Sequence, residues 1–78
     1  HAVDVESVTV EEQMEHLRRM VAEKGSLSFR ALFDHTFSRI GVVTTFIALL
    51  ELIRLGAVVA TQKRTFGEIT IEARMEES

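Results

Sequence analysis

The stretch Gly41-Val-Val-Thr-Thr-Phe-Ile-Ala-Leu-Leu-Glu-Leu-Ile-Arg-Leu-Gly56 decides how this chain folds. Its apolar side chains recur at helical spacing, and the glycine that closes it is a typical helix stop. At 100° per residue, the apolar side chains cover roughly 220° of the circumference. A surface helix needs only about 100° to face its own core. Such a helix is either buried on most sides or available to a partner, and the function depends on which.

Length and composition indicate one small globular domain. A chain of 78 residues buries only about 60–65% of the surface that it exposes when unfolded. The absence of cysteine excludes disulfides and thiolate metal sites. The longest uninterrupted apolar run, Phe46 to Leu50, is too short to span a bilayer, and the acidic N-terminus does not resemble a signal peptide. A net charge of −3 argues against autonomous nucleic-acid binding.

The pattern divides the chain into an extended lead-in (1–8), a folded domain (9–74) and an acidic tail (75–78). Thr9 and Glu12 have the spacing of a capping box, and the apolar residues after them predict a helix from about 10 to 24. Gly25 is expected to end it. Ser26-Leu27-Ser28 follows as a short extended link or a one-rung strand.

Two further helices and a hairpin complete the prediction. Ser28 can cap a brief second helix over 29–33 whose inward side chains are Phe29, Leu32 and Phe33, and Ser38 can cap the long third helix. Beyond Gly56 the apolar period falls to 2, which predicts strands over 57–62 and 66–72 around a polar turn at 63–65. Ile69, Ile71 and Ala73 share one face of the last strand. Three helices and a C-terminal β-hairpin wing predict an α+β winged-helix fold.

We expect the third helix to have two different apolar faces. The inward face is Ala48, Leu49, Leu52 and Leu55, and the outward face is Val43, Phe46, Ile47, Leu50 and Ile53. One interpretation is that the hairpin covers the outward face, as large apolar groups are usually buried. The interpretation that we favour is an exposed protein-docking surface. Reading of DNA by this helix is disfavoured, because its outer surface offers only Arg54 and two threonines.

Other candidate sites carry weaker signals. Lys63 and Arg64 at the hairpin tip could contact a phosphate, although solvated turn residues are the commoner explanation. His16 and His35 lack the spacing of metal ligands, so no metal site is expected. No nucleophile lies beside a plausible base, and the four glycines are isolated, so we expect neither an enzyme nor a bound cofactor.

The chain also resembles a known family. The segments that carry the resemblance are Ser28–Phe33, Ser38-Arg39, Val43–Gly56, Gln62 and Phe66-Gly67-Glu68-Ile69. Together they are similar to the C-terminal winged-helix domain of the segregation and condensation protein A (ScpA) family, the bacterial kleisins, over roughly residues 9–72. The combination of FIALLELIRLG with Q-x-x-x-F-G-E-I is more specific than any one short motif.

The resemblance implies a non-catalytic anchor in a cytoplasmic, nucleoid-associated complex. Such a domain docks on the ATPase head of an SMC protein, and other parts of the kleisin bind the second SMC subunit and the accessory protein ScpB. The docking residues that it implies are Phe46 and Leu50 at the centre, with Ile53, Arg54, Phe66 and Ile69 nearby. The alternative from another class is a winged-helix DNA-binding or regulatory module that uses Lys63 and Arg64.

Overall fold

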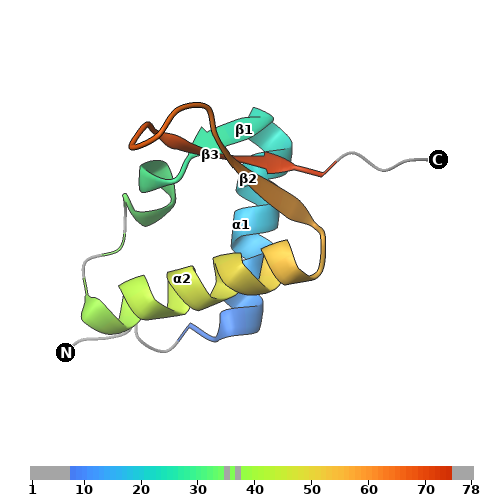
Figure 1. Cartoon of the computed structure of the whole chain (residues 1–78). Helices are drawn as coiled ribbons and strands as arrows, with labels where there is room; N and C mark the ends of the chain where they lie inside the picture. Colours follow the sequence, from blue (N-terminus) through green and yellow to red (C-terminus); the bar gives the residue numbers. More distant parts are fainter. Residues whose placement is uncertain (1–7, 35, 37, 75–78) are drawn as a thin grey trace.

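The computed structural model describes residues 8–34, 36 and 38–74. Within them the elements in chain order are α1 (Val10–Lys24), β1 (Ser26–Ser28), the 3-10 helix η2 (Arg30–Phe33), α2 (Arg39–Arg54), β2 (Val58–Gln62) and β3 (Ile69–Ala73). The strands form one antiparallel sheet in the order β1-β3-β2, and the two α-helices cross beside it (Figure 1). This mixed α+β architecture confirms the predicted class and is compatible with a winged-helix-like fold.

Local sequence signals explain α1. The Thr9 hydroxyl accepts a hydrogen bond from the Glu12 backbone N–H, and the Glu12 carboxylate accepts one from the Thr9 N–H, both at 3.0 Å. The predicted capping box is therefore confirmed, and with it the helix start. Gly25 ends the helix with a φ of 83°, a left-handed conformation that suits glycine.

The structure corrects the prediction of a second full helix before α2. Residues 30–33 form a single 3-10 turn, in which backbone N–H groups bond three residues back, as from Leu32 to Phe29 and from Asp34 to Ala31. A segment this short is commonly bonded this way, because it has too few residues to propagate an α-helix. The expected Ser28 cap does form, since its hydroxyl accepts the Ala31 N–H at 3.2 Å.

Both ends of α2 follow from the sequence. The Ser38 hydroxyl accepts the Gly41 N–H at 2.9 Å, which confirms the predicted N-cap. At the other end, Ala57 N–H bonds to the Leu52 carbonyl at 2.9 Å and Gly56 N–H to the Ile53 carbonyl at 3.0 Å. These two bonds, with Gly56 at a φ of 79°, make a Schellman motif that satisfies the last carbonyls of the helix.

The sheet is formed around β3, which pairs with both other strands. Ile71 lies opposite Leu27 of β1 and Ala60 of β2. The prediction that the last strand starts at Phe66 is wrong, because β3 starts at Ile69. Phe66 has a φ of 62°, which is incompatible with extended backbone, so 66–68 belong to the connection.

The core lies between α1, α2 and the sheet. Its buried apolar side chains are Leu17, Val21, Leu32, Ala48, Leu49, Leu52, Val58 and Ile71. Leu55, which was expected on the inward face of the long helix, is 58% exposed. Ala73, which was expected on the same strand face as Ile69 and Ile71, is exposed as well. Leu55 is the C-cap of α2 and follows the last helical residue, Arg54, so the buried face of the helix does not extend to it. The predicted acidic tail, and the predicted lead-in apart from Val8, lie outside the described residues.

Candidate functional site

One face of α2 remains uncovered by the rest of the described chain. Seven apolar side chains there, which we call the apolar stripe, are between 37% and 54% exposed: Ile40, Val42, Val43, Phe46, Ile47, Leu50 and Ile53. The opposite face buries Thr45, Ala48, Leu49 and Leu52. The hairpin therefore does not cover the outward face. Contiguous exposed apolar surface of this kind usually marks a site of interaction.

The stripe begins beside an aromatic corner that joins α2 to η2. The Phe46 ring meets Phe29 edge-to-face with centroids 6.5 Å apart, and Phe29 meets Phe33 at 5.1 Å. Together with Val42 and Val43, these three rings line an open apolar groove of about 370 Å³. Phe29 and Phe33 pack against the core, as the sequence predicted, but they are only half-buried and also form one wall of this groove. The sequence signal that could have predicted this groove is the four-residue spacing of Phe29 and Phe33, shortly before an apolar helix.

A charged pair lies on α2 near the C-terminal end of the stripe. The Arg54 guanidinium donates from Nε to both carboxylate oxygens of Glu51 at 3.1 Å, and a further bond from its terminal nitrogen makes an ion pair. The hydrogen bond from Arg54 lowers the pKa of Glu51, and the same bond raises the pKa of Arg54. Both groups thus stay charged at neutral pH, and Arg54 is already paired before any partner arrives.

The two hairpin residues expected in the same surface lie in different settings. Ile69 is half-buried, packs against the core, and accepts the Phe29 N–H at its carbonyl at 2.7 Å. Phe66 is 97% exposed in the connection between β2 and β3. That connection lies at the far side of η2 from α2 (Figure 1). The described chain therefore brings Phe46, Leu50, Ile53 and Arg54 together on α2 and leaves Phe66 apart from them.

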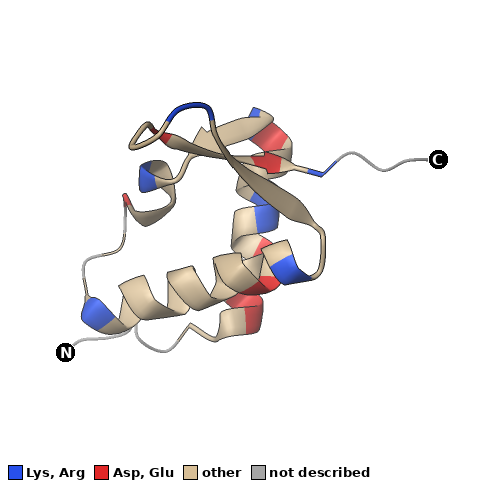
Figure 2. Cartoon of the chain, in the orientation of Figure 1, with Lys and Arg blue, Asp and Glu red and all other residues tan. Residues whose placement is uncertain are grey.

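The hairpin tip also carries Lys63 and Arg64, both exposed. Figure 2 shows a basic segment in the connection between β2 and β3, at the top of the view. Among the residues that the structure describes, the one salt bridge joins Arg54 to Glu51, so neither tip cation has a carboxylate within 4 Å. Within the described part of the chain, the candidate phosphate contact thus has no carboxylate partner.

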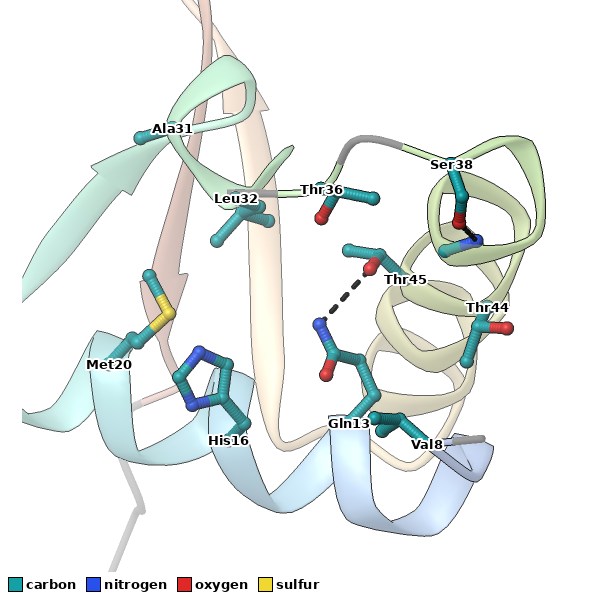
Figure 3. A pocket seen from close by; sticks show the side chains of 11 residues that line it. Val8, Gln13, His16, Met20, Ala31, Leu32, Thr36, Ser38, Thr44 and Thr45 are labelled. Atoms are coloured by element: carbon teal, nitrogen blue, oxygen red, sulfur yellow. Dashed lines mark hydrogen bonds between the residues drawn. The ribbon is translucent and has the colours of Figure 1, made fainter. Parts of the chain in front are cut away.

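A separate pocket of about 160 Å³, with a mixed polar and apolar lining, opens between α1, η2 and the start of α2 (Figure 3). At its base the Gln13 amide donates to the hydroxyl of Thr45, a buried residue, at 3.0 Å. His16 lines this pocket and is exposed. Within the described residues, no three His, Asp or Glu side chains gather as metal ligands would. His35 lies outside the described residues.

Among the helices of the described segments, none is long and apolar enough to cross a bilayer. The fold and the site define a class: a small α+β domain whose longest described helix has an exposed apolar face.

Comparison with known proteins names the family. A family profile described as segregation and condensation protein ScpA matches residues 1–74. Segregation and condensation protein A of Clostridium tetani is 36% identical over 97% of this chain, and that of Ligilactobacillus salivarius is 39% identical over 92%. The protein of the same name from Coxiella burnetii is 34% identical over 95%. The chain belongs to the ScpA family, and it spans 30% or less of the length of these relatives.

Proposed function

We propose that this chain is the C-terminal domain of a bacterial kleisin and that it docks on the ATPase head of an SMC protein. The apolar stripe of α2 carries the proposal, because seven half-exposed apolar side chains on one helix face are more than this fold requires. The names of the relatives, segregation and condensation protein A, support a role in chromosome segregation and condensation.

The topology supports the placement within the family's winged-helix domain. The strand order β1-β3-β2 and the order of elements suit that fold, provided that η2 stands where a second helix is usual. In this assignment α2 is the third helix, the element that winged-helix proteins commonly present to a ligand. Its outward face carries mostly aliphatic side chains and Phe46, which favours a protein surface over base edges.

Most of the binding free energy of such a surface is expected to come from the residues at its centre. Leu50 is 50% exposed and Phe46 is 43% exposed, so each has substantial apolar surface left to bury against a partner. Residues near the middle of an interface usually account for most of the binding energy, while the rim excludes water. Arg54, held by Glu51 at the edge, would be a rim group.

The mechanism is architectural. We assign ATP hydrolysis to the SMC head and anchoring to this domain, so that a kleisin that also holds the second SMC subunit closes a ring. Contacts with ScpB and with the second SMC subunit are assigned to parts of the longer relatives that this chain does not cover. No catalytic step is assigned to the chain itself.

The test substitutes one exposed leucine inside the stripe and one outside it. Leu50→Arg should weaken binding to a purified SMC head at least about 30-fold, the loss expected for a central interface residue. Leu55→Arg is the matched control, since Leu55 is 58% exposed, lies outside the stripe, and should leave affinity within about threefold. Titration calorimetry measures affinity, and thermal melting monitors the fold.

The outcomes separate the alternatives. Equal affinity of Leu50→Arg and the wild-type chain would reject docking through the stripe. If Leu50→Arg unfolds the domain, Leu50→Ala repeats the binding measurement with a milder change, and wild-type affinity in that variant would equally reject the proposal.

A further inference from the structure

The net charge of the chain hides an uneven distribution. Residues 25–67 contain five cations and two carboxylates, hence a net charge of +3, although the whole chain has a net charge of −3. The acidic excess lies in the segments before and after, including α1 (Figure 2). Arg54 is paired with Glu51, and the cations of this part that have no salt bridge to another described residue are Arg30, Arg39, Lys63 and Arg64. Two of these four stand together at the hairpin tip.

The tip holds an aromatic ring in an unusual way. Phe66 is 97% exposed and has a φ of 62°, a left-handed conformation that is unfavourable for a bulky residue. The Gln62 side-chain amide donates to the Gly67 carbonyl at 2.8 Å, and Gly67 N–H donates to the Arg64 carbonyl at 2.9 Å. These bonds close the turn on both sides of Phe66.

Glycine at position 67 is part of the same arrangement. A Cβ there would lie 2.7 Å from Arg64 Cγ and 3.0 Å from the Arg64 carbonyl oxygen, so the turn closes around a residue without a side chain. The chain thus accepts an unfavourable φ and a fully solvated ring at one position. The two hydrogen bonds to Gly67 hold this turn, but within the described part of the molecule no side chain covers the Phe66 ring, which points to a ligand for the ring.

We propose that the hairpin tip is a nucleic-acid contact, in which Lys63 and Arg64 bind backbone phosphates and the Phe66 ring packs on a neighbouring base or sugar. Unpaired cations gain affinity by releasing the counterions of a phosphate backbone. An exposed ring beside them can wedge into a minor groove or stack on an unpaired base. The three side chains lie within four consecutive residues, so one ligand can reach all of them.

The size of the tip favours nucleic acid over protein. A stable protein interface takes about 20–30 residues on each side, and the tip offers one ring and two cations. Phosphate contacts act as small independent increments, so two of them can add to binding made elsewhere in an assembly. The apolar stripe has the opposite character, with many aliphatic groups and no charge at its centre.

The tip and the stripe are separate surfaces. The connection between β2 and β3 lies beyond η2 from α2 (Figure 1), and the two surfaces share no residue. This inference therefore does not depend on the proposed SMC docking.

The test is a titration of the ¹⁵N-labelled chain followed by NMR, which detects weak binding. The probes are a mixed-sequence DNA duplex of about 20 base pairs and its separate single strand. We expect chemical-shift changes confined to residues 62–68 and a Kd of about 10⁻⁴ M at low salt. For the duplex, the slope of the logarithm of the association constant against the logarithm of the salt concentration should be about −1.8, the value for two phosphate contacts. Tighter duplex binding identifies a groove contact, and tighter single-strand binding identifies stacking on a base.

Variants assign the contributions. Lys63→Ala/Arg64→Ala should flatten the salt slope to near zero. Phe66→Asn, a residue that tolerates the left-handed conformation, should weaken binding about fivefold or more, whereas Phe66→Tyr keeps the ring and should retain affinity. Leu50→Ala should leave DNA binding unchanged.

Two results would overturn the inference. The first is the absence of DNA-induced shifts at the tip of the wild-type chain at low salt. The second is weaker binding of Phe66→Asn to an SMC head together with unchanged DNA binding, which would assign the ring to a protein interface.

Discussion

The two α-helices have nearly the same length and opposite relations to solvent. In α1 the fully buried side chains are Leu17 and Val21, and most of its remaining surface is charged or polar. In α2 the buried face is larger, and the face opposite to it is apolar as well. The first helix therefore shows what the fold alone demands of a helix here. The second carries an additional set of apolar groups that the fold does not use.

The two faces of α2 therefore have different roles: the buried face stabilises the fold, and the exposed stripe is the proposed binding surface. Burial of apolar surface contributes roughly 25 cal/mol per Å², and the stripe forgoes much of this contribution as long as it faces water. Truncation of a stripe residue should therefore cost less folding stability than truncation of a residue on the opposite face.

The largest expected effect compares two leucines two positions apart. Leu52 is 1% exposed, so Leu52→Ala should lower the free energy of unfolding by about 2–5 kcal/mol. Leu50→Ala should lower it by about 0.5 kcal/mol. Urea unfolding followed by circular dichroism measures both variants. Similar losses at the two positions would contradict the division of α2 into a structural face and a free one.

A smaller effect is expected at the start of α1. Thr9→Ala removes the hydroxyl that accepts the Glu12 N–H, which should cost about 1 kcal/mol and lower the melting temperature by about 4–8 °C. Thr9→Ser keeps the hydroxyl and should melt close to the wild-type chain. Ser38→Ala makes the corresponding change at α2, where the hydroxyl accepts the Gly41 N–H. Unchanged melting of both alanine variants would mean that neither cap contributes to stability.

The smallest effect concerns the charged pair at the edge of the stripe. Because the hydrogen bond from Arg54 lowers the pKa of Glu51 in the folded chain, the pair stabilises the fold above the unfolded pKa. This contribution is lost as the pH falls through the lowered folded pKa. Both groups are solvated, so the effect should be slight and weaker in salt. Glu51→Gln should have the same melting temperature as the wild-type chain at acidic pH and a slightly lower one at neutral pH in low salt. Identical melting temperatures at neutral pH would show that the pair contributes nothing to stability.

Much of the fold was predictable because its signals are local. The Thr9 and Glu12 spacing, the Ser38 cap and Gly56 each determine a helix end through bonds within a few residues. The brief second helix predicted over 29–33 is a single 3-10 turn, since a segment this short is too short to propagate an α-helix. Exposure of Leu55 depends on the angle between α2 and the sheet, which no local pattern specifies.

The candidate site was predictable in part. The arc of apolar residues on α2 predicted an outward face, but it did not show that Ile40 and Val42 extend that face to the first turns. The distance in space between Phe66 and the stripe was hidden as well, since a turn with a left-handed phenylalanine cannot be read from the residue type. Docking itself involves a second molecule, so it remains a prediction.

The Schellman motif at the end of α2 also has a mechanical consequence. Only residues 55–57 separate α2 from β2, and Gly56 and Ala57 are tied back onto the helix by backbone bonds. This connection is too short, and too closely hydrogen-bonded to α2, to act as a hinge. Tension applied to the stripe would pass directly into the rungs between β2 and β3, which run the length of both strands. In a domain of this kind, a force applied to α2 should reach the sheet with little extension of the connection between them.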